Sequence, residues 1–141
     1  MLGTKLNLRW SWTEEKWENF YYFKGTNIID AAVFWKKSGY IPNTFMCLSF
    51  QYQKHINIGK GGMILTDNFN AYKDLIKMSY DGRKRNIPWR KQNISSIGYH
   101  YYMTPEAAEE GLKIFKKKSK IPPRIWTYND YPDLKKFKCF K

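Results

Sequence analysis

The chain has 141 residues, of which 43% are hydrophobic and 18% aromatic, so it is too apolar for a disordered chain and has the length of one domain. With 25 basic and 12 acidic residues, its net charge of +13 favours polyanionic partners. The basic residues are scattered, apart from short clusters at 83–85 and 116–120. A nucleic-acid-binding module is therefore an alternative and not the leading hypothesis.

The first predicted elements are a helix and a strand. Thr13 precedes acidic residues in the pattern of a helix N-cap, and this helix is predicted to run to about Lys24. Residues 27–32, with the sequence NIIDAA, are predicted to form a short buried strand. An alternative makes Asp30 the N-cap of a helix over residues 31–37.

Two further strands and two helices are predicted in the middle of the chain. The strands cover residues 45–50 and 62–66, and the spacing of apolar residues predicts a helix over 69–78. Thr104 as N-cap and Pro105 at the first helical position open the last helix. This order of short strands and helices predicts an α/β fold with a mixed or parallel sheet.

The remaining segments are a loop and a tail. Residues 82–97 are polar and basic and are predicted to form a long loop between the two helices. The chain is expected to divide into residues 1–115 and an aromatic, basic tail over 116–141. An aromatic tail of this kind is expected to lie against another surface.

The cysteines and histidines give little sign of a metal site or a disulfide. Cys47 and Cys139 lack the spacing of either, and His55 and His100 lack zinc-ligand spacing. We find no secretory leader and no apolar stretch long enough to span a membrane. The sequence therefore predicts a cytoplasmic protein with no metal and no membrane contact.

Three residues near strand ends are candidates for chemistry. Lys54 carries a primary amine, which forms a Schiff base with an aldehyde once deprotonated; the alternative is a solvated loop lysine. Asp30 ends a buried strand, where a carboxylate is costly unless it meets a partner such as a cationic ring nitrogen. Ser49 offers a hydroxyl to a phosphate, or is an ordinary strand-end serine. The glycines within 59–62 predict a tight turn.

Five motifs in this order and spacing resemble the DegT/DnrJ/StrS family of pyridoxal phosphate (PLP)-dependent aminotransferases. The resemblance covers roughly residues 14–115. The motifs are IIDAA (28–32), SFQYQK (49–54), GKGGMILTD (59–67), YDGR (80–83) and GYHYYMTPEAA (98–108). Members of this family aminate nucleotide-linked keto-sugars in sugar nucleotide and polysaccharide biosynthesis.

The resemblance implies a role for each candidate residue. Lys54 would bond to the cofactor and move the proton during transamination, and Asp30 would pair with the pyridine nitrogen. Ser49 would hydrogen-bond the cofactor phosphate. His100 stands where the family has an asparagine that reaches the phosphate of the neighbouring subunit. Tyr102 replaces a family arginine and cannot supply its charge.

The resemblance also implies an architecture and partners. Residues 1–115 would be the second part of the large PLP-binding domain, a three-layer α/β/α arrangement with a mixed, mostly parallel sheet. The tail over 116–141 would stand in place of the small domain. The substrates would be a nucleotide-sugar and an amino donor, with glutamate implied as donor. The chain would form a homodimer or a complex with a chain that supplies the missing N-terminal half. The alternative is an inactive relative that serves as a binding or assembly subunit.

Overall fold

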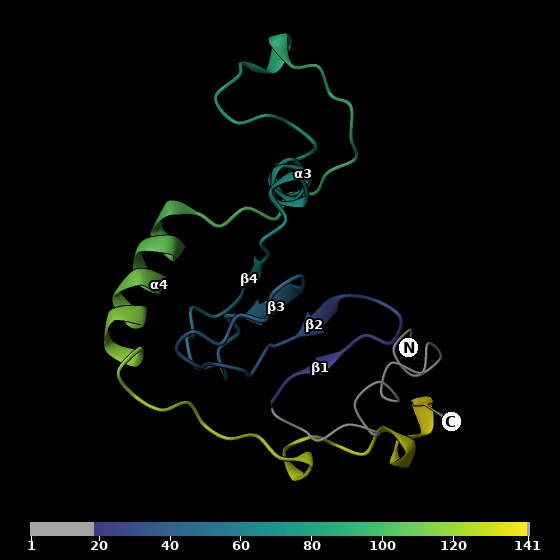
Figure 1. The fold of residues 1–141 in the computed structure, drawn as a ribbon, viewed down its shortest axis with the longest axis vertical. Helices are drawn as coiled ribbons and strands as arrows, with labels where there is room; N and C mark the ends of the chain where they lie inside the picture. The colour runs from purple at the N-terminus through teal and green to yellow at the C-terminus, as the bar shows by residue number, and fades with distance from the viewer. Residues whose placement is uncertain (1–18, 141) are drawn as a thin grey trace.

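The computed structural model describes residues 19–140, which form a four-stranded mixed sheet with two helices beside it (Figure 1). The strands are β1 (Tyr21–Tyr22), β2 (Ile28–Asp30), β3 (Phe45–Ser49) and β4 (Gly62–Leu65). The helices are α3 (Phe69–Ser79) and α4 (Pro105–Lys118). Four short 3-10 helices follow the same numbering: η1 (Trp89–Lys91), η2 (Tyr128–Asp130), η3 (Leu134–Lys136) and η4 (Lys138–Phe140).

The sheet has the strand order β1-β2-β3-β4. Strands β2 and β3 pair in parallel, whereas β1 pairs with β2, and β4 with β3, in antiparallel fashion. The mixed sheet and the α/β class agree with the prediction. The expectation of a mostly parallel sheet is wrong for the described strands, because β4 turns back to pair directly with β3, and β2 turns back to pair directly with β1.

The predicted helix at the N-terminal side is wrong where the structure describes it. Tyr21 and Tyr22 form β1, because aromatic side chains suit a half-buried sheet and the neighbouring β2 offers its edge. The expected N-cap at Thr13 lies outside the described residues. The alternative helix over 31–37 is also absent; Asp30 Oδ1 instead accepts a hydrogen bond from the Ala32 amide in a local turn.

The other predicted elements are confirmed, and their caps explain where they begin. The Asn68 side chain accepts a hydrogen bond from the Ala71 amide at the start of α3. The Thr104 hydroxyl accepts from the Ala107 amide at the start of α4, with Pro105 at the first helical position. Side-chain caps satisfy amides that a helix cannot bond internally, so both starts are readable from the sequence.

The core lies between β2 and β3 and consists of the buried residues Ile29, Ala31 and Met46. By contrast, neither α3 nor α4 has a buried residue. Large apolar side chains such as Phe69 on α3 and Leu112 on α4 face solvent. Amphipathic helices gain most of their stability by packing an apolar face, so these faces are suited to a covering surface that the described chain does not supply.

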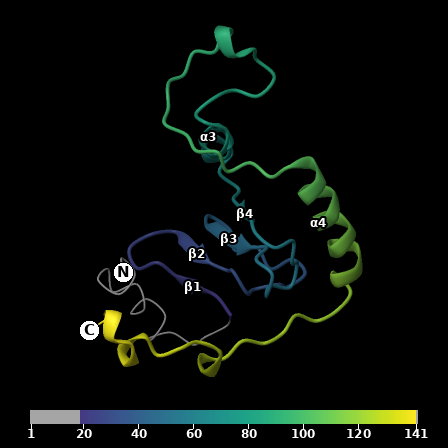
Figure 2. The same ribbon diagram turned by 180° about the vertical axis from the view of Figure 1, so that it is seen from behind.

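The helices and the loops form an open frame around the sheet. Helix α4 stands at one side of it, and the loop over residues 82–97 extends as an arm from the end that carries α3 (Figure 1). From α4 the tail returns along the edge that holds β1, as both views show (Figure 2). Within residues 19–140, no helix is long and apolar enough to cross a membrane.

Candidate functional site

Lys54 lies on a closed connection between β3 and β4. The Phe50 amide donates to the Gly61 carbonyl (2.9 Å) at the base of this connection, and the Lys54 amide donates to the Gln51 carbonyl (2.8 Å). Ile56 is only 3% exposed and anchors the connection to the body of the protein. Lys54 itself is half-buried. The backbone thus holds this lysine in place, unlike that of a mobile solvated loop.

The glycines after Lys54 are required by the hairpin. Gly62 pairs with Ser49, and a Cβ at residue 62 would lie 2.5 Å from the Leu48 carbonyl oxygen. Gly59 and Gly61 have φ angles of +89° and +104°, which L side chains rarely adopt. The predicted tight turn is confirmed, and at Gly62 the approach is between two backbones.

Helix α4 supports the same connection from outside. His55 Nε2 lies 2.9 Å from the Lys118 carbonyl oxygen at the end of α4. The Trp35 ring packs near His55 and Phe115, with centroid distances of 5.8 and 6.5 Å. Trp35 Nε1 is buried and has no hydrogen-bond partner within residues 19–140. A buried N–H without an acceptor is costly, so this donor is free to bind one.

Asp30 ends β2 with neutral hydrogen-bond donors around it. Its Oδ2 accepts from the Tyr21 hydroxyl on β1, and its Oδ1 accepts from the Ala32 amide, both at 2.9 Å. None of the lysines, arginines or histidines in the described part of the chain forms an ion pair with it. Each carboxylate oxygen has two acceptor lone pairs, so Asp30 keeps capacity for a cationic partner.

The charge on Asp30 affects its neighbours. Burial, followed by the charge of Asp30, raises the pKa of the Tyr21 phenol well above its ordinary value. The pKa of the Cys47 thiol and that of the Tyr131 phenol rise for the same two reasons, in the same order. A negative charge disfavours a second one nearby. These groups therefore stay protonated around the Asp30 carboxylate.

Ser49 and Asp30 share one edge of the sheet. Strands β2 and β3 are parallel neighbours, and Asp30 is in register with Cys47, two residues before Ser49. Carboxyl ends of adjacent parallel strands meet at the same edge, which is where α/β sheets commonly bind ligands. The Ser49 Oγ accepts from the Gln51 amide (3.3 Å), which leaves its hydroxyl hydrogen for another acceptor. The cofactor roles of both residues remain predictions.

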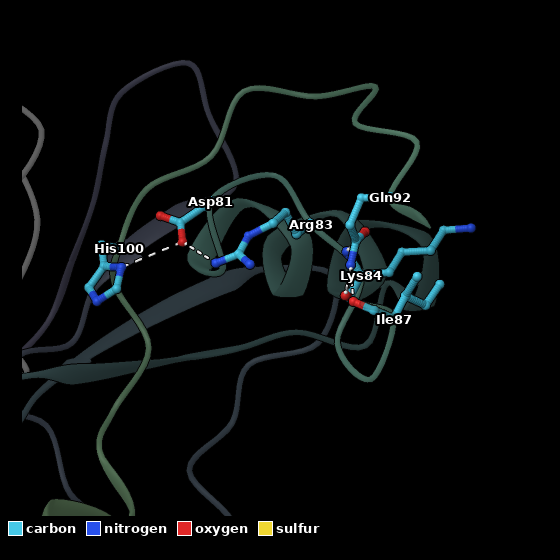
Figure 3. A network of polar contacts seen from close by, with 6 residues as sticks. All are labelled: Asp81, Arg83, Lys84, Ile87, Gln92 and His100. Atoms are coloured by element: carbon cyan, nitrogen blue, oxygen red, sulfur yellow. Dashed lines mark hydrogen bonds and ion pairs between the residues drawn. The ribbon is translucent and has the colours of Figure 1, made fainter. Parts of the chain in front are cut away.

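His100 belongs to a different cluster, at the base of the arm. Arg83 Nη2 donates to Asp81 Oδ2 (2.8 Å), and His100 Nδ1 lies 3.5 Å from the same oxygen (Figure 3). The Arg83 hydrogen bond, with a smaller contribution from His100, lowers the pKa of the Asp81 carboxyl. The His100 side chain is 71% exposed, and no contact among the described residues joins it to Lys54, Asp30 or Ser49.

The arm beyond this cluster is closed by one glutamine. The Gln92 amide group donates to the carbonyls of Lys84 and Ile87, both at 2.7 Å, and accepts from the Lys84 amide (Figure 3). The Arg83 guanidinium lies over the rings of Tyr80 and Trp89, at 4.6 and 4.4 Å from their centroids. The predicted loop therefore has an internal framework that composition does not reveal.

The sequence analysis missed one residue beside Lys54. Trp126, in the C-terminal tail, is 8% exposed, and Lys54 Nζ lies 5.0 Å from its ring centroid. The aromatic composition of the tail was the available signal, and Trp126 does contact another segment, whereas most other described side chains of the tail are exposed. That signal did not identify which segment.

Comparison with solved structures shows which proteins share this fold. The structure is similar to one from Bacillus cereus ATCC 10987 described as a PLP-dependent aminotransferase, with a TM-score of 0.53 and 23% identity. The match covers 65% of this chain and 25% of that one, so this chain spans about a quarter of that protein's length. The likeness concerns the fold, which is that of part of a PLP-dependent aminotransferase.

The sequence identifies the family within that class. The profile of the DegT/DnrJ/EryC1/StrS aminotransferase family matches residues 25–121, and the chain belongs to this family. The family resemblance inferred from the five motifs is thereby confirmed. No curated protein sequence matches the chain. Residues 122–141 lie beyond the family match.

Proposed function

We propose that the protein is a PLP-dependent aminotransferase, or one chain of a split one, that transfers an amino group to a nucleotide-linked keto-sugar. Glutamate is the proposed donor, and sugar nucleotide and polysaccharide biosynthesis the proposed context. The observation that supports this best is Asp30, a half-buried carboxylate with no ionic partner among the described residues, in a chain of net charge +13. Such a carboxylate suits a cationic ring nitrogen.

The available donors fit the chemistry of pyridoxal phosphate. Lys54 supplies a primary amine for the aldehyde, and Asp30 an anion for the ring nitrogen. Ser49 has a hydroxyl hydrogen to donate to the phosphate, and Trp35 Nε1 is a further buried N–H without an acceptor. When bound, the cofactor supplies an electron sink for the carbon that loses its proton.

Each residue then has a defined task. Asp30 would accept a hydrogen bond from the ring N–H and would favour the protonated ring nitrogen, while the Tyr21 hydroxyl orients the carboxylate through Oδ2. Lys54 would hold the cofactor aldehyde through its Nζ amine and, as a free amine, would move a proton. Ser49 holds the phosphate through its hydroxyl.

Partners complete the proposed enzyme. The apolar faces of α3 and α4 support association with a second copy, or with a chain that supplies the rest of a three-layer large domain. In such an assembly His100 donates a hydrogen bond to the phosphate in a neighbouring subunit. Residues 1–115 are the proposed part of the large domain, and residues 116–141 are the tail that follows it. The free thiols of Cys47 and Cys139 support a cytoplasmic location.

A second candidate is an inactive relative that acts as a binding or assembly subunit, or as a nucleic-acid-binding module. The net charge of +13 favours it, because dispersed positive charge attracts polyanions. Binding of a nucleic acid that weakens steeply with salt, in a protein that does not take up PLP, would support this candidate instead.

An absorbance titration with PLP tests the leading proposal. We expect a visible band from the lysine-bound cofactor in the unmodified chain and none in Lys54→Ala. Lys60→Ala is the matched control, because Lys60 is an exposed lysine of the same connection. A band that survives in Lys54→Ala would contradict the role of Lys54. The proposed function would be contradicted if no visible band formed under any condition, whether the chain is monomeric, dimeric or mixed with its partner chain.

A further inference from the structure

We propose that residues 122–133 form an autoinhibitory strap, in which the Trp126 ring covers the Lys54 amine until the strap is released. This inference rests on the proposed function of Lys54. The segment lies beyond the family match and returns from α4 to the side of the sheet that holds β1 (Figure 1).

The contact between the two side chains is direct. Lys54 Nζ lies 5.0 Å from the Trp126 ring centroid, and Trp126 is buried, at 8% exposed. A cation–π contact holds the Lys54 amine against the indole face. The ring therefore occupies the space beside the amine, where an aldehyde would have to approach it.

Hydrogen bonds on both sides of Trp126 hold the strap. The Trp126 amide donates to Asn19 Oδ1 (2.9 Å), which ties it to the segment before β1. Asp130 accepts from the Thr127 amide (2.8 Å), the Thr127 hydroxyl (3.1 Å) and the Arg124 guanidinium. The Arg124 guanidinium also lies 4.3 Å from the Trp126 ring centroid. The strap is thus a turn held by its own hydrogen bonds, which fix the position of Trp126.

The strap also reaches the second candidate group. The Tyr131 ring lies 5.9 Å from that of Trp126, and its phenol is subject to the charge of Asp30. One short segment therefore approaches both the amine of Lys54 and the carboxylate of Asp30. Release of this segment would open both sites together, as expected of a device that controls access.

Chemical labelling of the full chain tests the strap without the cofactor. Formaldehyde condenses with a neutral lysine amine with loss of water, and cyanoborohydride reduces the imine to a methylated amine. Mass spectrometry then gives the methylation rate of Lys54, with exposed Lys60 as internal reference. We expect Lys54 to react about fivefold more slowly than Lys60, because the amine must leave the Trp126 ring before it meets formaldehyde and a cation–π contact is worth about 1 kcal/mol.

Two variants and one control identify the cause. Trp126→Ala should bring the Lys54 rate close to that of Lys60, and Ile125→Ala should not, because Ile125 is 76% exposed. Asp130→Ala should also raise the Lys54 rate, since it removes the Thr127 and Arg124 anchors and keeps the ring. This second variant covers the case in which Trp126→Ala fails to fold.

Three outcomes separate the strap from the proposed function. Equal rates for Lys54 and Lys60 in the unmodified chain would overturn the strap. So would a Lys54 rate that neither folded variant raises. If the variants raise this rate and PLP still gives no visible band in any of them, the strap is supported and the aminotransferase proposal is contradicted.

Discussion

Two aspartates at the ends of secondary-structure elements have opposite surroundings. Asp81, after α3, has a guanidinium at 2.8 Å and an imidazole at 3.5 Å, whereas Asp30, the last residue of β2, has a phenol and an amide as its hydrogen-bond donors among the described residues. Arg83 and His100 satisfy Asp81 within the chain, so it has a structural part in the base of the arm. Asp30 is held in place but not neutralised, which is the arrangement expected of a carboxylate that awaits a cationic ligand.

The largest effect should come from Asp30→Asn, with Asp81→Asn as the matched control. An amide keeps the shape of the carboxylate but loses its charge, and a hydrogen bond to a charged group is worth about 1.5–3 kcal/mol. We expect the affinity for PLP to fall by roughly 10- to 100-fold in Asp30→Asn, measured by titration of the visible band. Equal losses in the two variants would erase the distinction between the aspartates.

Tyr21→Phe should sharpen the role of Asp30 with a smaller effect. The variant removes the hydroxyl that donates to Asp30 Oδ2 and keeps the ring in β1. A single hydrogen bond contributes about 1 kcal/mol, so the affinity for PLP should fall by roughly fivefold. An unchanged titration curve would mean that Tyr21 does not orient the carboxylate.

Tyr21 also predicts a loss of stability in base. Its pKa is raised in the folded state, so its contribution is full below the unfolded value near pH ~10 and is lost as pH rises above it. Urea denaturation should therefore show a steep fall in the free energy of unfolding above about pH 10. Tyr21→Phe should flatten this fall; the same slope in both proteins would argue against a buried phenol.

Asp81 makes the corresponding prediction in acid. Its pKa is lowered in the folded state, so its contribution is present above the unfolded value of about 3.9 and is lost as pH falls through the lowered pKa. Denaturation below about pH 4 should be less pH-dependent in Asp81→Asn than in the unmodified chain. If the free energy of unfolding had the same pH dependence in acid in both proteins, Arg83 and His100 would not stabilise this carboxylate.

The smallest effect on cofactor binding should come from Arg83→Ala. The change removes the guanidinium that bonds Asp81 and lies over the rings of Tyr80 and Trp89. Amide hydrogen exchange should quicken within residues 83–97, while the PLP titration stays the same. A marked loss of PLP binding would show that the arm and the sheet edge are coupled within one chain.

The sequence predicts best where local chemistry decides the structure. Asn68 and Thr104 cap α3 and α4 with their own side chains, so both helix starts follow from short patterns. The hairpin glycines follow from backbone geometry that other residues adopt with difficulty. The placement of Lys54, Asp30 and Ser49 near strand ends follows from the same local reading.

Contacts between distant segments escaped prediction. Tyr21 and Tyr22 form a strand because they pair with the free edge of β2. The helix-like pattern of the preceding residues is local and cannot predict this pairing. About half of the chain separates Trp126 from Lys54 in sequence, and no periodicity predicts such a contact. The choice of antiparallel pairing for β4 is likewise made by the connection to β3 and not by the strand's own residues.

The most direct test of the central claim is to trap the cofactor on its lysine. The full chain and Trp126→Ala are incubated with PLP, reduced with borohydride and mapped by mass spectrometry. We predict that the reduced cofactor is attached to Lys54 in both proteins, that it accumulates faster in Trp126→Ala, and that Lys60 remains largely unmodified. Cofactor spread evenly over the exposed lysines, with no preference for Lys54 in either protein, would contradict the account.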